Sequence, residues 1–254
     1  MTTTGPVTPS SRTVQVALNG DSDHPAMPRT PADIAADAAA CVVAGATVLH
    51  LHAFDDEGVE TLAEQEVGRT LRAVRARCPG VPVSMTTFAQ IEPDPARRLA
   101  TVAAWDELPD LVPANQGEDG ITELTDLLVA RGVGVEACVF SVADVERFLE
   151  RGRHDRFVRI VVEPMEPEPS AACDHAVRME SLLAENGVAL EQVQHGMGAA
   201  TWPVLRQAVQ RGHGFRIGLE DTGELPDGRV AAGNPELVEA ALTIARGRRG
   251  RPRG

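Results

Sequence analysis

The feature that most constrains the fold is an alternation of short apolar runs with longer helical segments, which repeats eight times along the 254-residue chain. The apolar runs have the length of buried strands, and turn-forming residues separate them from the helices. They lie at residues 14–18, 46–54, 81–86, 110–112, 133–140, 157–163, 192–196 and 214–220. Eight strands that alternate with helices over about 250 residues predict an α/β fold, a (β/α)8 TIM barrel. A doubly wound open sheet is the alternative, although such a sheet seldom has eight regular units.

The segments between the strands carry helix start and stop signals. The first has Thr30 as an N-cap, Pro31 at the first helical position and Gly45 as its end. Helices are predicted at residues 30–44, 62–77, 95–105, 120–131, 142–151, 171–186, 203–211 and 235–246. Residues 13–246 are therefore predicted to form one catalytic barrel domain. Residues 1–12 are predicted to be a flexible tail, and residues 247–254 a basic disordered tail.

Composition excludes several function classes. The net charge of −13 argues against a nucleic-acid partner, because phosphate binding needs a basic face. No run reaches membrane-spanning length, and residues 1–12 lack an apolar signal core, so no membrane partner is predicted. The four cysteines have neither metal-type nor redox-type spacing, as expected of reduced thiols in a cytoplasmic protein. No glycine-rich nucleotide loop follows any strand.

Two histidines in the second strand are candidate metal ligands. Successive side chains on a strand point to opposite faces, so His50 and His52 share one face. Two imidazoles roughly 6–7 Å apart along a strand can bind one divalent metal ion. The alternative is a strand edge that carries two partly solvated histidines.

The end of the eighth strand can complete this site. Arg216 and Glu220 are four residues apart on the predicted eighth strand and so share a face, with Gly218 between them leaving space. Strands 2 and 8 contribute to the same layers of a barrel, so Glu220 can complete a His2Glu site that suits zinc with an open position. Asp221 points elsewhere and is free to act as a base. The alternative is a structural ion-pair cluster.

These residues carry a resemblance to a known family. The matching segments are residues 17–20, 30–31, 44–46, His50-Leu51-His52, 195–196, the Arg-Ile-Gly-Leu-Glu-Asp run 216–221, 225–228 and Asn234. They extend over nearly the whole chain, and the chain thereby resembles the beta-keto acid cleavage enzymes, typified by 3-keto-5-aminohexanoate cleavage enzyme.

The resemblance implies a zinc-dependent cleavage of a beta-keto acid that consumes acetyl-CoA and yields acetoacetate and a new acyl-CoA. It implies that His50, His52 and Glu220 hold the metal, which acts as a Lewis acid. Asp221 and Arg216 would assist proton removal, together with a hydroxyl after the third strand that aligns with Thr86. Family members of this kind are oligomeric, so we expect a homo-oligomer, a tetramer.

Three departures from the family pattern concern the substrate-contacting positions. Phe54 stands where the family usually has Arg, and the segment Thr87-Phe88-Ala89 replaces Thr-Gly-Gly. Pro113 occupies the place of a Ser or Thr that commonly precedes the residue at Asn115 by two positions. The metal set is intact, so either the substrate differs or CoA is not used.

Other polar residues at strand ends are candidate substrate contacts: Asn19, Thr87, Asn115, Glu136, Glu163 and His195. A buried Glu needs a partner, so Glu136 and Glu163 either line the site or belong to structural pairs. His195 either lines the pocket or is a satisfied core imidazole. Two other functions stay open, namely a CoA-independent metal-dependent aldolase or hydrolase of a keto acid, and a non-catalytic metal-containing binding barrel.

Overall fold

Eight parallel strands close into a barrel in the computed structural model, which describes residues 12–247. Their order around the barrel is β1 (Val14–Ala17), β10 (Gly214–Ile217), β9 (Gln192–Gln194), β8 (Phe157–Val162), β7 (Gly134–Val139), β6 (Leu111–Asn115), β5 (Val83–Met85) and β2 (Val48–Leu51). The prediction of a (β/α)8 barrel is confirmed, and the open doubly wound sheet is excluded because β1 pairs with both β10 and β2. The predicted tails lie outside the described residues except for Arg12 and Gly247.

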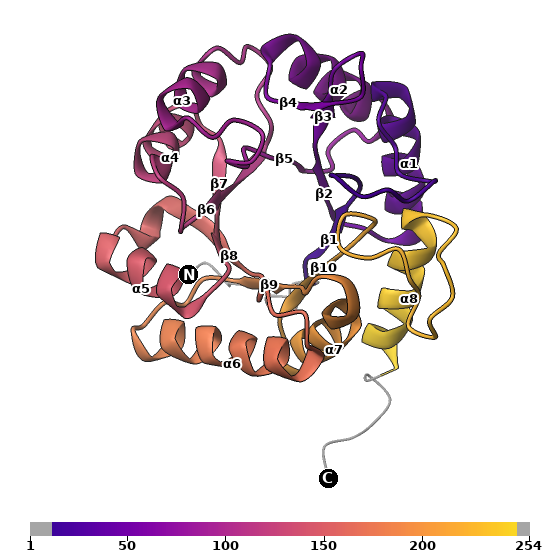
Figure 1. The fold of residues 1–254 in the computed structure, drawn as a ribbon, viewed down its shortest axis with the longest axis vertical. Coiled ribbons are helices and arrows are strands. Elements are labelled where there is room, and N and C mark those ends of the chain that lie inside the picture. The colour runs from indigo at the N-terminus through magenta and orange to yellow at the C-terminus, as the bar shows by residue number, and fades with distance from the viewer. Residues whose placement is uncertain (1–11, 248–254) are drawn as a thin grey trace, which may run out of the picture.

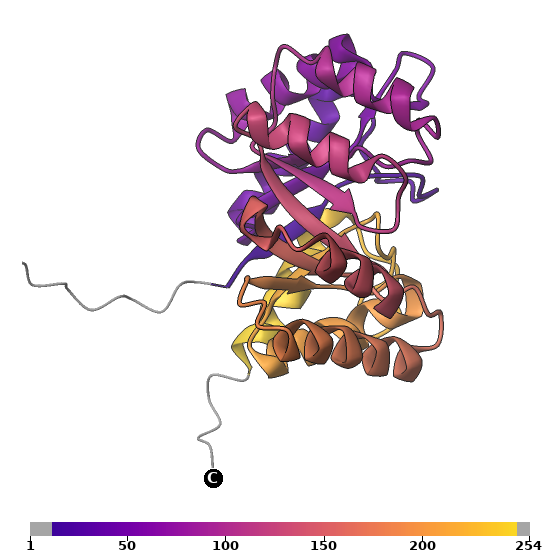
Figure 2. The same ribbon diagram turned by 90° about the vertical axis from the view of Figure 1, so that its left-hand side faces the viewer.

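Eight α-helices form the outer layer around this barrel (Figures 1 and 2). They are α1 (Pro31–Ala44), α2 (Glu64–Arg77), α3 (Pro95–Ala103), α4 (Ile121–Ala130), α5 (Val142–Arg151), α6 (Pro169–Glu185), α7 (Thr201–Arg211) and α8 (Asn234–Arg246). Short 3-10 turns at His154–Arg156 and Gly198–Ala200 precede β8 and α7. No described helix is both long enough and apolar enough to cross a membrane.

The first helix begins and ends as its sequence predicts. The Thr30 side chain accepts a hydrogen bond from the backbone N–H of Asp33, and Pro31 occupies the first turn. At its other end, Gly45 adopts φ 118°, a left-handed conformation that favours glycine. The local signals thus set both boundaries of α1.

The predicted histidine strand is shorter than expected. It leaves the barrel after Leu51, and β3 (Ala53–Phe54) then pairs antiparallel with β4 (Glu60–Thr61). The Asn19 side chain causes this change, because its Oδ1 accepts the backbone N–H of His52 at 2.8 Å. His52 therefore lies at the mouth of the barrel rather than within the strand.

The eighth barrel strand also ends early, at Ile217 rather than Glu220. A Cβ atom on Gly218 would lie 1.9 Å from the carbonyl oxygen of Ala17, so the chain passes against β1 where only glycine fits. The chain then turns, and the N–H of Asp221 donates to the carbonyl of Gly218 at 2.9 Å. The prediction that Glu220 lies on a strand with Arg216 is wrong, since Glu220 comes from this turn.

Candidate active site

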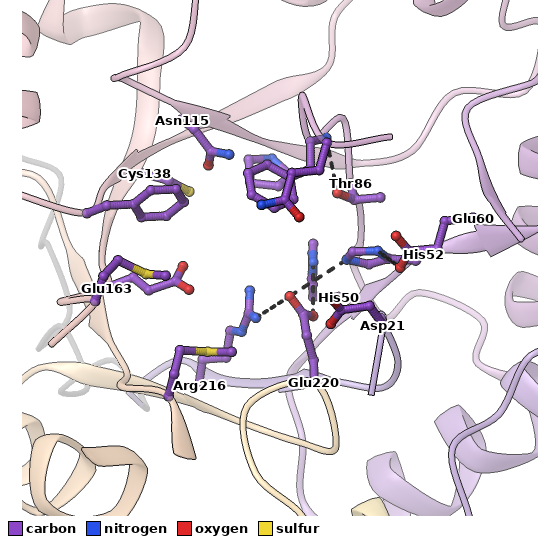
Figure 3. Close-up of a pocket in the computed structure, with 17 residues that line it drawn as sticks. Asp21, His50, His52, Glu60, Thr86, Asn115, Cys138, Glu163, Arg216 and Glu220 are labelled. Atoms are coloured by element: carbon purple, nitrogen blue, oxygen red, sulfur yellow. Dashed lines mark hydrogen bonds and ion pairs between the residues drawn. The ribbon is translucent and has the colours of Figure 1, made fainter. Parts of the chain in front are cut away.

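The three predicted metal ligands meet at the mouth of the barrel (Figure 3). His50 lies on β2, His52 follows that strand, and Glu220 lies in the turn after β10. The Nε2 atom of His50 lies 3.4 Å from Oε2 of Glu220, and Nε2 of His52 lies 3.7 Å from Oε1. One ligand atom from each residue lies within 4.8 Å of the others. The arrangement is a possible metal site.

A polar partner at Nδ1 orients the ring of each histidine. Nδ1 of His50 lies 3.3 Å from Oγ of Ser84, whose hydroxyl donates to Glu136 at 2.7 Å. Nδ1 of His52 lies 2.7 Å from Oε1 of Glu60. In the neutral form of each ring, these acceptors favour the proton on Nδ1, which directs Nε2 at Glu220. This tautomer leaves Nε2 free to bind a metal ion.

The donor set fits a divalent cation. Nε2 of His52 and Oε2 of Glu220 are buried and have no hydrogen-bond partner within the described residues. Burying such atoms is costly unless a partner compensates them. Two nitrogens and one carboxylate on three side chains are the ligands of a zinc site with an open position. The three residues therefore fit a divalent metal ion.

The surrounding charges favour this assignment. Burial lowers the pKa of His50 well below its usual range, which keeps that ring neutral. Burial alone would also lower the pKa of His52, but the carboxylates of Glu220 and Glu60 raise it to about 9. Burial alone would raise the pKa of Glu220, whereas Arg216 and the two histidines hold it well below its usual range. A cation is therefore stabilised between His52 and these carboxylates.

Gly20 and Asn234 determine where Glu220 lies. Gly20 leaves room for Glu220, since a Cβ at Gly20 would lie 3.0 Å from Cγ of that residue. Asn234 accepts the N–H of Leu219 and donates to the carbonyl of Leu18, both within 2.8 Å. This amide therefore ties the turn that carries Glu220 to the end of β1.

Asn19, predicted to contact substrate, instead forms hydrogen bonds to the protein backbone. Its side chain is fully buried, and its amide nitrogen donates to the carbonyls of Pro28 and His52. Together with its bond to the N–H of His52, these contacts use the whole side chain. Asn19 thus positions His52, a candidate metal ligand, and does not line the cavity.

Arg216 and Asp221 form a buried ion pair beside the metal ligands. Nη2 of Arg216 lies 2.6 Å from Oε1 of Glu220 and 2.8 Å from Oδ1 of Asp221. Asp221, expected from the sequence to be free to act as a base, is enclosed, because its side chain has no exposed surface. The turn at Gly218 directs it inward, underneath the guanidinium of Arg216.

His195 connects this pair to the other side of the cavity. Its Nδ1 lies 3.4 Å from Oδ1 of Asp221, and its Nε2 lies 3.2 Å from Oε2 of Glu163. Burial and Arg216 lower the pKa of His195, but the two carboxylates outweigh them and raise it to about 9. The ring is fully buried, so His195 is a linking residue rather than a cavity-lining one.

A cavity of about 210 Å³ opens in front of the metal ligands. Among the predicted contacts, Thr86, Asn115 and Glu163 line it. Thr87 does not, because its buried hydroxyl donates to the carbonyl of Pro113 at 3.3 Å. The rest of the lining includes six side chains without charge: Phe88, Pro113, Cys138, Phe140, Met165 and Met197.

Two predicted residues lie away from this cavity. Glu136 is fully buried inside the barrel, where burial raises its pKa and Ser84 donates to it. It therefore supports His50 through Ser84 instead of touching substrate. Phe54 packs outside the cavity, with the guanidinium of Arg29 5.9 Å from its ring centre. Phe54 itself is therefore not part of the cavity lining.

Sequence reasoning missed several functional partners. Ser84 and Glu60 orient the histidines, and Glu118 accepts from the amide of Asn115 at 2.7 Å. The buried Arg98 holds Glu118 from behind, with Nη1 2.8 Å from its Oε2. Ser84 could have been predicted only from the strand register, which pairs it with His50. The sequence does not reveal that register.

Comparisons with known proteins find relatives over most of the chain. A family model described as beta-keto acid cleavage enzyme matches residues 12–252. A 3-keto-5-aminohexanoate cleavage enzyme from Fusobacterium nucleatum is 27% identical over 88% of this chain and 85% of its own. A 3-oxoadipate:acetyl-CoA acetyltransferase from Cupriavidus necator is 24% identical over 91% of this chain and 87% of its own.

A solved structure shares the fold. The binary complex of ObcA with oxaloacetate aligns with a TM-score of 0.73 at 18% identity and covers 88% of this chain. The chain spans 64% of the length of ObcA. The family match confirms the resemblance found in the sequence, and with it the expectation of an enzyme that cleaves a carbon–carbon bond.

Proposed function

This chain belongs to the beta-keto acid cleavage enzyme family, and from that premise we propose that it is a zinc-dependent enzyme that uses acetyl-CoA. A beta-keto acid R–CO–CH₂–COO⁻ and acetyl-CoA would yield R–CO–S-CoA and acetoacetate. One C–C bond of the keto acid breaks, and the acetyl carbonyl forms a new one. The observation that carries the proposal is the pair of Nε2 atoms that faces the Glu220 carboxylate beside this cavity.

His50, His52 and Glu220 would hold the zinc ion. When bound, zinc would supply a Lewis acid that polarises the keto oxygen of the substrate. Arg216, which lines the cavity next to these ligands, would bind the substrate carboxylate by charge-assisted hydrogen bonds. The hydroxyl of Thr86 would hydrogen-bond to the same substrate from the β5 side.

The proton between the two carbonyl groups needs an acceptor within reach of the cavity. The resemblance implies that Asp221 is this acceptor, but in the structure Arg216 and His195 enclose its carboxylate. Glu163 lines the cavity and faces His195, which in turn faces Asp221. We assign proton removal to this relay, with Glu163 at the cavity and Asp221 behind it.

The proposal is tested with purified protein and a panel of beta-keto acids, assayed with and without acetyl-CoA. Acetoacetate that forms only with acetyl-CoA is the expected result. Turnover without acetyl-CoA would instead favour a CoA-independent aldolase or hydrolase. If metal binds and no acid turns over under either condition, the chain is a metal-containing binding barrel and the proposal fails.

Assembly and location complete the proposal. We propose a homotetramer that packs through the outer helices, because family members of this kind are oligomeric. A monomer mass by light scattering at micromolar concentration would contradict it. We also propose the cytoplasm, since Cys41, Cys78, Cys138 and Cys173 are free thiols. Cell fractionation would test that location.

A further inference from the structure

The cavity has two unlike sides. The metal ligands come from β2 and from the turn after β10, which are the two neighbours of β1 in the barrel. β7 lies opposite β1, four strands away in either direction. In Figure 3, His52 and Glu60 accordingly face Cys138 and Glu163 across the open space. A substrate bound at the metal would therefore direct its tail toward β7 and its neighbours.

Six side chains of the cavity lining that have no amide or charged group are here named the apolar wall: Phe88, Pro113, Cys138, Phe140, Met165 and Met197. Four of them, Pro113, Cys138, Phe140 and Met165, come from β6, β7 and the segments that follow β7 and β8. The amides of Gln90 and Asn115 line the same cavity. Phe88 and Phe140 meet edge to face, with ring centres 6.4 Å apart. Burial raises the pKa of Cys138 well above its usual range, so that side chain is a neutral thiol. The wall therefore offers surface for apolar contact.

Glu163 is the charged group beside this wall, and a partner already compensates its charge. Its Oε2 lies 3.2 Å from Nε2 of the buried His195. The guanidinium that lines the cavity, that of Arg216, is engaged by Glu220 and Asp221 on the metal side. A carboxylate on the substrate tail would be repelled by Glu163, and the apolar wall has no cationic side chain to pair with it. An ammonium would lose water at the wall, and Glu163, the carboxylate that could compensate it, already faces His195.

We propose that the apolar wall receives an uncharged hydrocarbon tail, so that the substrate is a beta-keto acid with an alkyl chain. The inference rests on the proposed function for the reaction, and it adds the substrate class. The cavity of about 210 Å³ is smaller than the roughly 300–1,000 Å³ of pockets that hold drug-sized ligands, which suits a short chain. Each methylene that the wall buries should improve binding about fourfold.

The experiment compares three acids of equal carbon number: 3-oxohexanoate, 3-oxo-5-aminohexanoate and 3-oxoadipate. Their tails are respectively uncharged, cationic and anionic. With acetyl-CoA and zinc, we expect kcat/KM for 3-oxohexanoate to exceed both others by roughly tenfold or more, since a charge on the tail must be desolvated at the wall. A charged acid that equals or surpasses 3-oxohexanoate would overturn the inference.

A binding readout separates this inference from the proposed function. Each acid is titrated into the zinc-loaded protein without acetyl-CoA, and the shift in thermal midpoint is recorded. If 3-oxohexanoate binds most tightly, the inference about the apolar wall is supported even when no acid turns over. The absence of turnover would contradict only the proposed reaction. Equal binding of the three acids, or tighter binding of a charged one, overturns the wall.

A charge added to the wall sharpens the test. Met165 is 53% exposed, so Met165→Arg should fold normally while placing a cation at the cavity. We expect this variant to shift the kcat/KM ratio and the binding order toward 3-oxoadipate by roughly tenfold. The matched control is Val43→Arg on α1, where the side chain is 90% exposed. An unchanged preference in Met165→Arg would contradict the assignment of the wall.

Discussion

The two sides of the cavity are built in different ways. On the metal side each functional group has a second residue behind it: Ser84 behind His50, Glu60 behind His52, and Arg216 beside Glu220. On the apolar wall, Phe88, Phe140 and Met197 are half-buried, and their side chains have no N–H or O–H group through which a hydrogen bond could fix them. Hydrogen bonds with fixed geometry hold reacting groups in place, whereas apolar contacts tolerate exchange. Under the proposed function, the metal side would set the reaction and the wall would set the substrate.

The largest effect should follow from breaking the metal side. In His50→Ala and Glu220→Gln we expect loss of bound zinc and a fall in turnover of roughly 10³-fold or more, since the Lewis acid is lost. Elemental analysis and the acetyl-CoA assay measure the two effects. The matched control is Glu239→Gln, an exposed position on α8. Full zinc occupancy in both variants would refute the ligand set.

The next largest effect concerns the relay that joins the two sides. Glu163→Gln and Asp221→Asn keep the shape of the side chains and remove a proton acceptor, so we expect a loss of roughly 10²–10⁴-fold in rate. Zinc content should stay near that of the original protein. The matched control is Glu185→Gln at the exposed end of α6.

A different outcome would assign these residues to the scaffold. If Asp221→Asn lowers the thermal midpoint but leaves the turnover of the folded fraction intact, the ion pair with Arg216 is structural only. If Glu163→Gln has the same kcat across the pH range as the original protein, Glu163 does not carry the proton.

A smaller effect should separate the ligands from their supports. Glu60→Gln weakens the acceptor for Nδ1–H of His52, and such outer contacts typically change metal affinity by roughly 10–100-fold. Competition with a chelator measures the affinity. Glu57→Gln, exposed in the same hairpin, is the control. Equal affinities in the two variants would show that Glu60 does not orient the histidine.

The smallest effect should come from Asp37, which accepts a hydrogen bond from Asn234 behind the metal side. We expect it to change the stability of the protein and not its turnover. Burial raises the pKa of Asp37 from 3.8 to about 6, although a bond from Asn234 opposes the shift. Because the folded pKa exceeds the unfolded one, the original protein should lose stability as pH rises from about 4 to about 6. The loss is at most about 3 kcal/mol, since one pKa unit corresponds to about 1.4 kcal/mol.

Asp37→Asn removes this titration and keeps an acceptor for the Asn234 amide. The variant should therefore be more stable than the original above about pH 6, and the two should converge near pH 4. Chemical unfolding of both proteins at several pH values gives the difference. A stability difference that does not change with pH would contradict the raised pKa.

Much of the fold could be predicted because local signals agree with it. The cap at Thr30 and the glycine at Gly45 bound α1 both in the sequence and in the structure. Boundaries failed where distant chain segments decide them. β2 ends at Leu51 because Asn19 takes the N–H of His52, and β10 ends at Ile217 because Ala17 lies against Gly218. No local pattern announces either contact.

The sequence by itself determined the barrel and the identities of the three candidate metal ligands, because strand periodicity and ligand chemistry are properties of the residues themselves. The tertiary structure alone decided which polar residues face the cavity. Glu163 reaches it, whereas Asp221 and Glu136 lie buried behind other groups. Direction and burial depend on the register of eight strands and on the turns that follow them. These arise only when the barrel closes, since each strand is positioned by two neighbours that can be distant in the chain.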